Sequence, residues 1–247
     1  MNDISCEEKI EEVIKEEKKI ENLLKEEKKI LRWPLVERFE HHTLILLTFV
    51  FIVTGLPILK IEWFSWLITP PNTIVTTHDA VDLFRLIHKA AAGIFVIMAI
   101  FHMSYHTLAV RRTRIKITSK DLTDTISLFK YYLGLTRDKP KLGFHNPTEK
   151  ILVYWLMAVW FMAFMGVSGF VLMFPSYFSI WIHEWALVIH DVFFYLIVFM
   201  LIAHFYMTVL YKEYRPLLEG IFTTGLISPK FVREHHPLWY EEVKEKE

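Results

Sequence analysis

Four long apolar runs, separated by strongly charged segments, constrain this sequence more than any other feature. They cover roughly residues 41–60, 83–108, 150–174 and 184–211. A helix needs about 20 apolar residues to cross a hydrocarbon core of about 30 Å. Because lipid offers no hydrogen bonds to the backbone, a single run of this length can cross it only as a helix. The sequence therefore predicts an all-α membrane protein built as a four-transmembrane-helix bundle.

Composition narrows the kinds of function that such a bundle can have. The chain is 53% hydrophobic yet 23% charged, which fits apolar spans joined by charged segments. Its formal net charge is +0, so nothing indicates nucleic acid as a partner. A single cysteine, Cys6, excludes an internal disulfide, a cysteine-ligated iron–sulfur cluster and a CxxCH haem attachment. Any redox cofactor needs other ligands, and the twelve histidines are the candidates.

Lysine and arginine are concentrated on one side of the expected spans. Nine lie before the first span, ten lie in the loop at 109–150, and six lie from residue 212 onward. The segments 61–82 and 175–183 have none. Cytoplasmic loops carry the excess of these residues. We therefore expect a multi-pass protein of the cell (inner, cytoplasmic) membrane, with both termini and the middle loop in the cytoplasm.

The spans divide the chain into three parts. Residues 1–32 contain the hexapeptide KEEKKI twice and space Glu and Lys three or four positions apart, which predicts a charged N-terminal helix. Residues 33–211 are the four-helix transmembrane domain. Residues 212–247 are a cytoplasmic C-terminal tail.

Two histidines in the fourth span suggest that it holds two cofactors. His190 and His204 are fourteen residues apart, so they project from nearly one face of a helix, about 21 Å apart along its axis. A b-type haem takes two imidazoles, usually from facing helices of a bundle. The fourth span can therefore supply one ligand to each of two haems, one near each membrane surface.

Each of these histidines needs a partner at the same depth. His88 in the second span matches His190, whereas His41 and His102 both match the depth of His204. Periodicity and depth leave this second choice open. Two other interpretations remain: histidines that hydrogen-bond within the bundle, and a proton-relay or metal-transport set.

Two arginines lie beside the proposed ligands. Arg38 and Arg85 each precede a histidine by three residues and so share its helical face. Either guanidinium can form a bidentate pair with a haem propionate. The alternative is that each extends to the membrane interface without a cofactor partner.

Five stretches carry a resemblance to a known family. They are RFEHHT at 38–43, RLIHKAAAG at 85–93, HNPTEKILVYW at 145–155, VIH at 188–190 with a further histidine at 204, and EHHPLWYEEV at 234–243. Over residues 32–243 the chain resembles the cytochrome b (gamma) subunit of membrane-bound respiratory formate dehydrogenases and related dihaem quinone-reactive cytochrome b subunits.

The resemblance implies a ligand set for two haems b. The outer haem would be held by His88 and His190, and the inner haem by His41 and His204. His102 stays as the alternative to His41, because the surroundings depart from the family pattern. His42 stands where the family often has tryptophan, and Gly93 lies one residue later than expected.

The resemblance also implies a quinone site on the cytoplasmic side, at the turn that opens the third span. Asn146, Thr148, Glu149 and His204 would form it, with menaquinone or ubiquinone as the substrate. Thr148 and Glu149 replace the family's glycine and glutamine. Asn146 followed by proline is also typical of a helix N-cap, and the two roles are compatible.

The implied function is electron transfer from an extracytoplasmic iron–sulfur subunit and catalytic subunit, formate dehydrogenase above all, to the membrane quinone pool. The chain itself would reduce quinone, while substrate oxidation takes place on the partner subunits. The alternatives are the cytochrome b subunit of a membrane-bound hydrogenase or another molybdenum or tungsten enzyme, a stand-alone dihaem oxidoreductase, and a haem-free transporter.

Overall fold

The computed structural model describes residues 29–60, 62–64, 76–109 and 115–245. Four of its helices are long and apolar enough to cross a membrane. The spans consist of α2 (Leu35–Leu59), α4 (Thr77–Ser104) with η1 (Tyr105–Ala109), η2 (Glu149–Phe161) with α6 (Met162–Met173), and α7 (Ile180–Phe205) with η4 (Tyr206–Leu210). The predicted four-helix membrane bundle is confirmed. The side of the membrane on which the termini lie stays a prediction.

Two spans begin about six residues earlier than their apolar runs. Helix α2 starts at Leu35, directly after Pro34, and α4 starts at Thr77. A capping box fixes the start of α4. The Asp79 backbone N–H donates to the Thr76 hydroxyl oxygen, and the Thr76 backbone N–H donates to the Asp79 carboxylate. Hydropathy cannot detect this start, because the first turns are polar.

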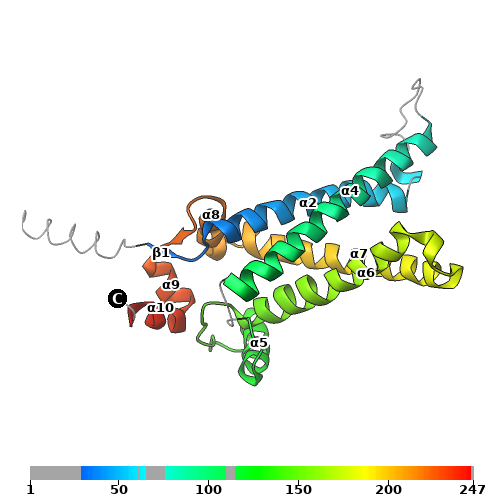
Figure 1. The fold of residues 1–247 in the computed structure, drawn as a ribbon. Coiled ribbons are helices and arrows are strands. Elements are labelled where there is room, and N and C mark those ends of the chain that lie inside the picture. Colours follow the sequence, from blue (N-terminus) through cyan, green and yellow to red (C-terminus); the bar gives the residue numbers. More distant parts are fainter. Residues whose placement is uncertain (1–28, 61, 65–75, 110–114, 246–247) are drawn as a thin grey trace, which may run out of the picture.

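The spans pack as two helix pairs. Helix α2 packs against α4, and α6 packs against α7 across the short link η3 (Pro175–Tyr177) (Figure 1). Only 6% to 17% of the most apolar window of each span is buried within the chain. Lipid or other bound groups must therefore cover most of the apolar helix surface.

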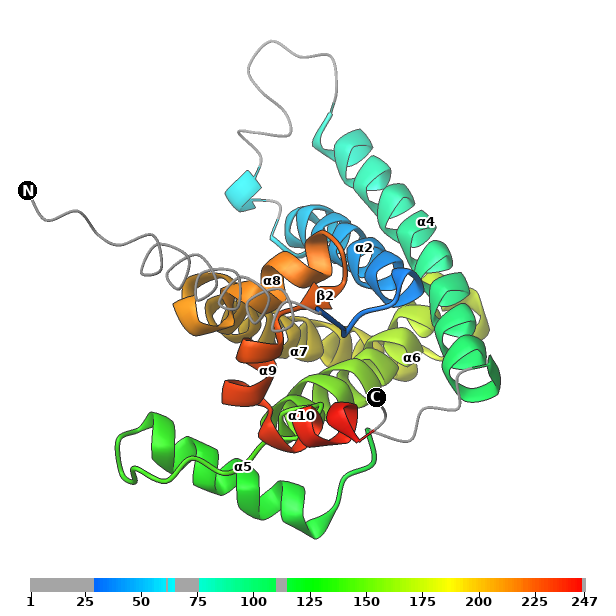
Figure 2. The ribbon, with the colours of Figure 1, turned by 90° about the vertical axis from the view of Figure 1, so that its left-hand side faces the viewer.

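The other elements gather at one end of the bundle, which we call the capped end (Figures 1 and 2). They are α5 (Ser119–Tyr132), η5 (Lys212–Tyr214), α8 (Arg215–Phe222), α9 (Pro229–His235), α10 (Pro237–Lys244) and two short strands. The π-helical segments η1, η2 and η4 also lie towards this end. Such turns are frequent at functional sites. We call the opposite end the open end.

A two-stranded sheet joins the two ends of the described chain. Strand β1 (Ile30–Leu31) pairs antiparallel with β2 (Leu226–Ile227). Gly225 precedes β2 with φ +80, and a Cβ there would lie 2.1 Å from the Trp33 carbonyl oxygen. Only glycine fits this close approach. Residues 30–31 are thus a strand, and residues 1–28 of the predicted N-terminal helix lie outside the described residues.

The segment predicted as a C-terminal tail folds against the capped end around a small core of its own. Its buried residues are Tyr214, Ile227, Phe231, Val232 and Trp239. Arg32 is buried beside them, with its guanidinium carbon 4.7 Å from the centroid of the Phe144 ring and 5.2 Å from that of Trp239. Aromatic faces attract such a cation. Burial lowers the pKa of Arg32, and the negative charge of Glu149 opposes that shift.

Low pH is expected to destabilise this folded C-terminal segment because of His236. Its Nδ1–H donates to the Gly143 carbonyl over 2.7 Å, and burial, followed by the Arg32 charge, lowers its pKa to about 4. The unfolded segment binds a proton below a pKa of about 6.5, whereas the folded one stays neutral. Stability is therefore lost as pH falls from about 6.5 towards 4, by about 1.4 kcal/mol per pH unit.

Hydrogen exchange of α9 and α10 at pH 7 and pH 5, corrected for intrinsic exchange rates, measures this effect. In His236→Asn, which keeps an N–H donor but does not titrate, the dependence on pH should be flat. Equal protection at both pH values in the unmodified chain would contradict the assignment.

Candidate functional site

His88 and His190 face each other between the two helix pairs. His88 comes from α4 and His190 from α7, and their ring centroids are 6.4 Å apart with the planes at 65°. Two metal–imidazole bonds of about 2 Å, plus about 1 Å on each side from the nitrogen to the ring centroid, give roughly 6 Å. The spacing therefore suits two imidazoles that bind one metal from opposite sides.

A hydroxyl group orients each of these two imidazoles. The Thr54 hydroxyl donates to the Val50 carbonyl over 2.7 Å and lies 2.8 Å from His88 Nδ1. The Ser168 hydroxyl lies 2.6 Å from the Phe164 carbonyl and 3.0 Å from His190 Nδ1. Because each hydroxyl proton is already donated, Nδ1–H of each histidine is the donor to the hydroxyl oxygen. Both Nε2 lone pairs are then free for a metal.

A glycine follows each hydroxyl residue and leaves space for the ring. A Cβ on Gly55 would lie 3.4 Å from His88 Cε1, and one on Gly169 would lie 3.3 Å from His190 Cε1. The hydroxyl–glycine pair thus occurs twice, once in each helix pair. Sequence reasoning missed these four residues. The signal was a hydroxyl–glycine dipeptide inside each of two otherwise apolar runs.

The second proposed set lies at the capped end. His41 is near the start of α2 and His204 near the end of α7, and the two imidazoles are close enough for their charges to interact. His41 Nδ1 is buried without a hydrogen-bond partner. The ring of Phe222 from α8 packs edge-on against His41, with centroids 6.1 Å apart. His42 is engaged elsewhere, since its Nδ1–H donates to the Arg38 carbonyl.

His102, the alternative to His41, is turned towards a different group. Its Nδ1 lies 3.2 Å from a carboxylate oxygen of Glu40, and His106 Nε2 lies 2.9 Å from the same oxygen. His102 therefore lies against α2, and its Nδ1 is engaged by Glu40, the residue that precedes His41 in the sequence.

Comparison with known proteins assigns the chain to a family. Residues 32–224, most of the chain, match the family model described as prokaryotic cytochrome b561. This chain belongs to the prokaryotic cytochrome b561 family. The nitrate-inducible formate dehydrogenase cytochrome b556(Fdn) subunits of Escherichia coli K12 and Shigella flexneri are each 22% identical to it over 223 residues. These alignments cover 88% of this chain and 93% of each relative.

Membership in the cytochrome b561 family confirms the predicted resemblance. It makes the chain a multi-pass b-type cytochrome of the membrane, implies that it binds haem b, and supports a role in electron transfer. The donor set suits this cofactor, because haem iron in such proteins takes imidazole ligands. The facing pair of His88 and His190, each with a free Nε2, fits that requirement.

The two arginines predicted to meet haem propionates have protein partners. Arg38 donates through Nε to the Ile221 carbonyl over 3.2 Å and through Nη2 to that of Thr223. It thereby satisfies carbonyls at the C-terminal end of α8. Arg85 Nη1 lies 3.2 Å from Asp82 one turn earlier on α4. Contact with a propionate stays a prediction for both residues.

Three of the four predicted quinone residues lie at the start of the third span of this cytochrome b561, and the fourth, His204, lies in the fourth span. Asn146 Oδ1 accepts from the Thr148 backbone N–H over 2.9 Å, as an N-cap does, and the Asn146 N–H donates to Glu149 over 3.4 Å. Glu149 also lies 3.9 Å from His145 and near enough to His204 for their charges to interact. The structure thus brings together the turn and the fourth span.

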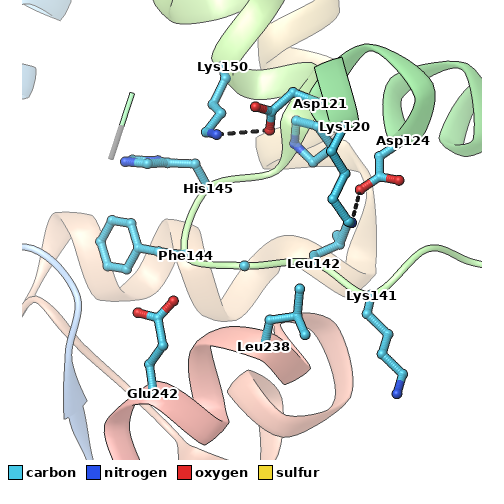
Figure 3. A pocket seen from close by; sticks show the side chains of 12 residues that line it. Lys120, Asp121, Asp124, Lys141, Leu142, Phe144, His145, Lys150, Leu238 and Glu242 are labelled. Atoms are coloured by element: carbon cyan, nitrogen blue, oxygen red, sulfur yellow. Dashed lines mark hydrogen bonds and ion pairs between the residues drawn. The ribbon is translucent and has the colours of Figure 1, made fainter. Parts of the chain in front are cut away.

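A pocket at the capped end lies next to this turn, between α5, the loop at 141–147 and α10 (Figure 3). His145, Pro147 and Lys150 line it, and Lys150 Nζ is held 2.8 Å from Asp121. The four predicted quinone residues are not among its lining residues. The pocket therefore does not serve as evidence for the predicted quinone site.

Removing the hydroxyl beside His190 is expected to weaken haem binding. Ser168→Ala leaves Nδ1–H of His190 without its acceptor, and loss of such a supporting bond typically costs about 10- to 100-fold in metal affinity. Transfer of haem to apomyoglobin should accelerate by about 10-fold or more. Ser127→Ala is the matched control, since Ser127 bonds a carbonyl on its own helix but no histidine. Equal transfer rates in the two variants would contradict the role of Ser168.

Proposed function

We propose that this cytochrome b561 is a dihaem subunit of the inner, cytoplasmic membrane, which carries electrons from an extracytoplasmic module to the quinone pool. The observation that carries the proposal is the pair His88 and His190, whose rings face each other 6.4 Å apart with both Nε2 atoms free. The second pair consists of His41 from α2 and His204, which lies on the same fourth span as His190 but at a different depth. One helix then serves both haem sites.

The residues of the chain supply binding and orientation, and haem b supplies reversible one-electron chemistry when bound. Thr54 and Ser168 hold His88 and His190 in the tautomer that leaves Nε2 unprotonated. Gly55 and Gly169 let the helices approach these rings. The apolar surroundings exclude water and keep the local dielectric constant low.

The orientation that we propose puts the capped end in the cytoplasm. Among the described residues at this end, 29–40, 115–150 and 212–245 carry three, seven and five lysines and arginines. The described residues at the open end, 62–64, 76–82 and 175–183, carry none. The exposed rings of Trp63, Trp181 and Trp185 near the open end suit a membrane interface.

Quinone reduction would then take place at the capped end, beside His41 and His204. Asn146, Thr148, Glu149 and His204 are the proposed quinone residues. The Glu149 carboxylate, with His145 and the buried Arg32 close by, would relay protons from the cytoplasm towards a reduced quinone without storing them. Menaquinone and ubiquinone share the carbonyl groups that such a site would bind.

The partners that we propose are an iron–sulfur subunit and a catalytic subunit on the open, extracytoplasmic side. The similarity to formate dehydrogenase cytochrome b556(Fdn) subunits over 88% of the chain favours formate as the substrate of that catalytic subunit. A hydrogenase, another molybdenum or tungsten enzyme, or a stand-alone oxidoreductase would leave the same haem ligands in place.

The haem-to-protein ratio of the purified protein, by pyridine haemochrome, tests the proposal. About two haems b per chain are expected, one for each histidine pair. One haem per chain would remove one of the pairs, and a colourless, well-folded protein from haem-supplied cells would refute electron transfer. Purification of the native complex separates the alternatives, since a stand-alone oxidoreductase would carry no iron–sulfur subunit.

A further inference from the structure

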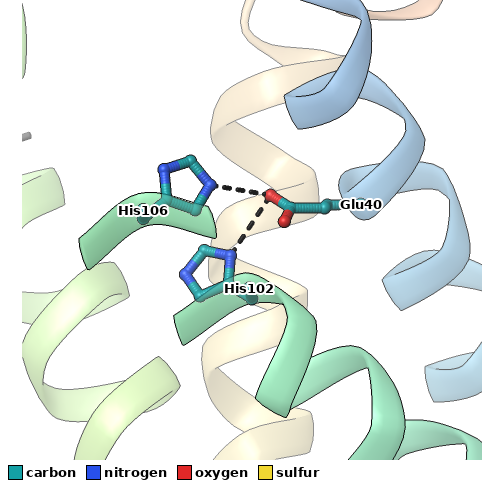
Figure 4. Close-up of side chains that lie close together, drawn as sticks. All are labelled: Glu40, His102 and His106. Carbon is teal, nitrogen blue, oxygen red and sulfur yellow. Dashed lines mark hydrogen bonds and ion pairs between the residues drawn. The ribbon is translucent and has the colours of Figure 1, made fainter. Parts of the chain in front are cut away.

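Three side chains that the haem proposal does not use meet between α2 and α4 at the capped end (Figure 4). Glu40 comes from α2, His102 from the end of α4 and His106 from the π-helical segment η1. One ligand atom from each lies within 4.8 Å of the other two. One Glu40 oxygen is 3.2 Å from His102 Nδ1 and 2.9 Å from His106 Nε2.

The carboxylate is costly to keep where it lies. The Glu40 side chain is 10% exposed, and its other oxygen, Oε1, is buried without a hydrogen-bond partner. The two imidazole rings lie beside this carboxylate, with centroids 4.4 Å apart. One divalent cation would balance the carboxylate and leave both imidazoles neutral.

We propose that Glu40, His102 and His106 bind a divalent transition-metal ion of the Zn²⁺ type. Ligand atoms on such an ion lie about 2.0 to 2.2 Å from it, so neighbouring ligand atoms are roughly 3 Å apart. The two contacts of 3.2 and 2.9 Å match this spacing. Two imidazoles favour zinc, copper, iron or nickel over Mg²⁺ or Ca²⁺, which prefer oxygen ligands. Three protein ligands leave coordination positions for water.

Access and position both suit an exchangeable ion. The His102 side chain is 55% exposed and His106 is 19% exposed, and both lie in the last turns of the second span, so an ion can enter from the aqueous phase at the capped end. The ion would join α2 to α4 at the capped end. It would also lie next to His41, which follows Glu40 in the sequence, without using any of the four proposed haem ligands.

Equilibrium dialysis of the haem-loaded protein against Zn²⁺, with metal counted by mass spectrometry, tests the site. The unmodified chain is expected to retain one Zn²⁺ that His106→Ala and Glu40→Gln release, with an affinity loss of at least about 10-fold in each variant. Co²⁺ in place of Zn²⁺ should give visible ligand-field bands that disappear in the same variants. Mg²⁺ should not compete.

His78→Ala is the matched control, because His78 forms an exposed pair with Asp82 over 3.1 Å near the start of α4 and, in the described part of the chain, belongs to no group of three ligands. Zn²⁺ binding in this variant should equal that of the unmodified chain. The decisive variant is His106→Ala, because His106 is no candidate haem ligand and its loss should leave the haems in place. The haem content is measured in the same sample. Zn²⁺ retention in His106→Ala equal to that of the unmodified chain, or no retention in either, would overturn the proposal.

Discussion

Replacing His88 by alanine is expected to lower the haem b content of the purified protein from about two to about one per chain. The imidazole of His88 faces His190 at 6.4 Å and comes from the other helix pair. Without it, the iron at this depth keeps one protein ligand, and a low-spin haem needs two. Pyridine haemochrome on samples of known protein concentration measures the loss, and a redox titration should show that one of two transitions has disappeared.

His190→Ala should give the same loss, and the double variant should lose no more than either single one, because the two residues serve one haem. His78 lies on the same helix as His88 but is exposed near the start of that helix, so His78→Ala should keep both haems. Size-exclusion chromatography shows whether the variants stay folded. Unchanged haem content in folded His88→Ala protein would contradict the assignment of His88 and His190 as the two ligands of one haem.

The sequence predicted the spans well because hydrocarbon imposes a length and a composition that a single apolar run reveals. It predicted the starts of α2 and α4 less well, since Pro34 and the capping pair of Thr76 and Asp79 lie in polar surroundings. The fold of the C-terminal segment was not predicted at all. Its small core forms from residues far apart in sequence, such as Tyr214 and Trp239, and from the pairing of β1 with β2.

For the candidate site, helical periodicity identified His190, His204 and His88 from the sequence. Periodicity could not identify the orienting hydroxyls, because Thr54 and His88 are 34 residues apart and only packing brings them together. The expected role of Arg38 illustrates the reverse case. Spacing alone put its guanidinium beside a haem ligand, whereas the folded chain offers it two carbonyls at the end of α8.

A loss of equal size is expected at the capped end, where it distinguishes His41 from His102 as the ligand. His41→Ala is expected to remove the inner haem and to spare the outer one, which again lowers the content from about two to about one haem per chain. His102→Ala should leave both haems in place. The choice of His41 rests on its interaction with His204, since the two are close enough for their charges to interact, whereas the partner observed for His102 is Glu40, 3.2 Å from its Nδ1.

Redox titration combined with haem analysis distinguishes the two variants, because the haem that remains in His41→Ala should have the potential of the one that is lost in His88→Ala. The combination His41→Ala with His88→Ala should then contain no haem, whereas His102→Ala with His88→Ala should keep about one per chain. Loss of a haem in folded His102→Ala protein, with none lost in His41→Ala, would make His102 the inner ligand. It would also withdraw His102 from the proposed metal site, because an imidazole whose Nε2 binds haem iron keeps its proton on Nδ1 and can only donate it to Glu40.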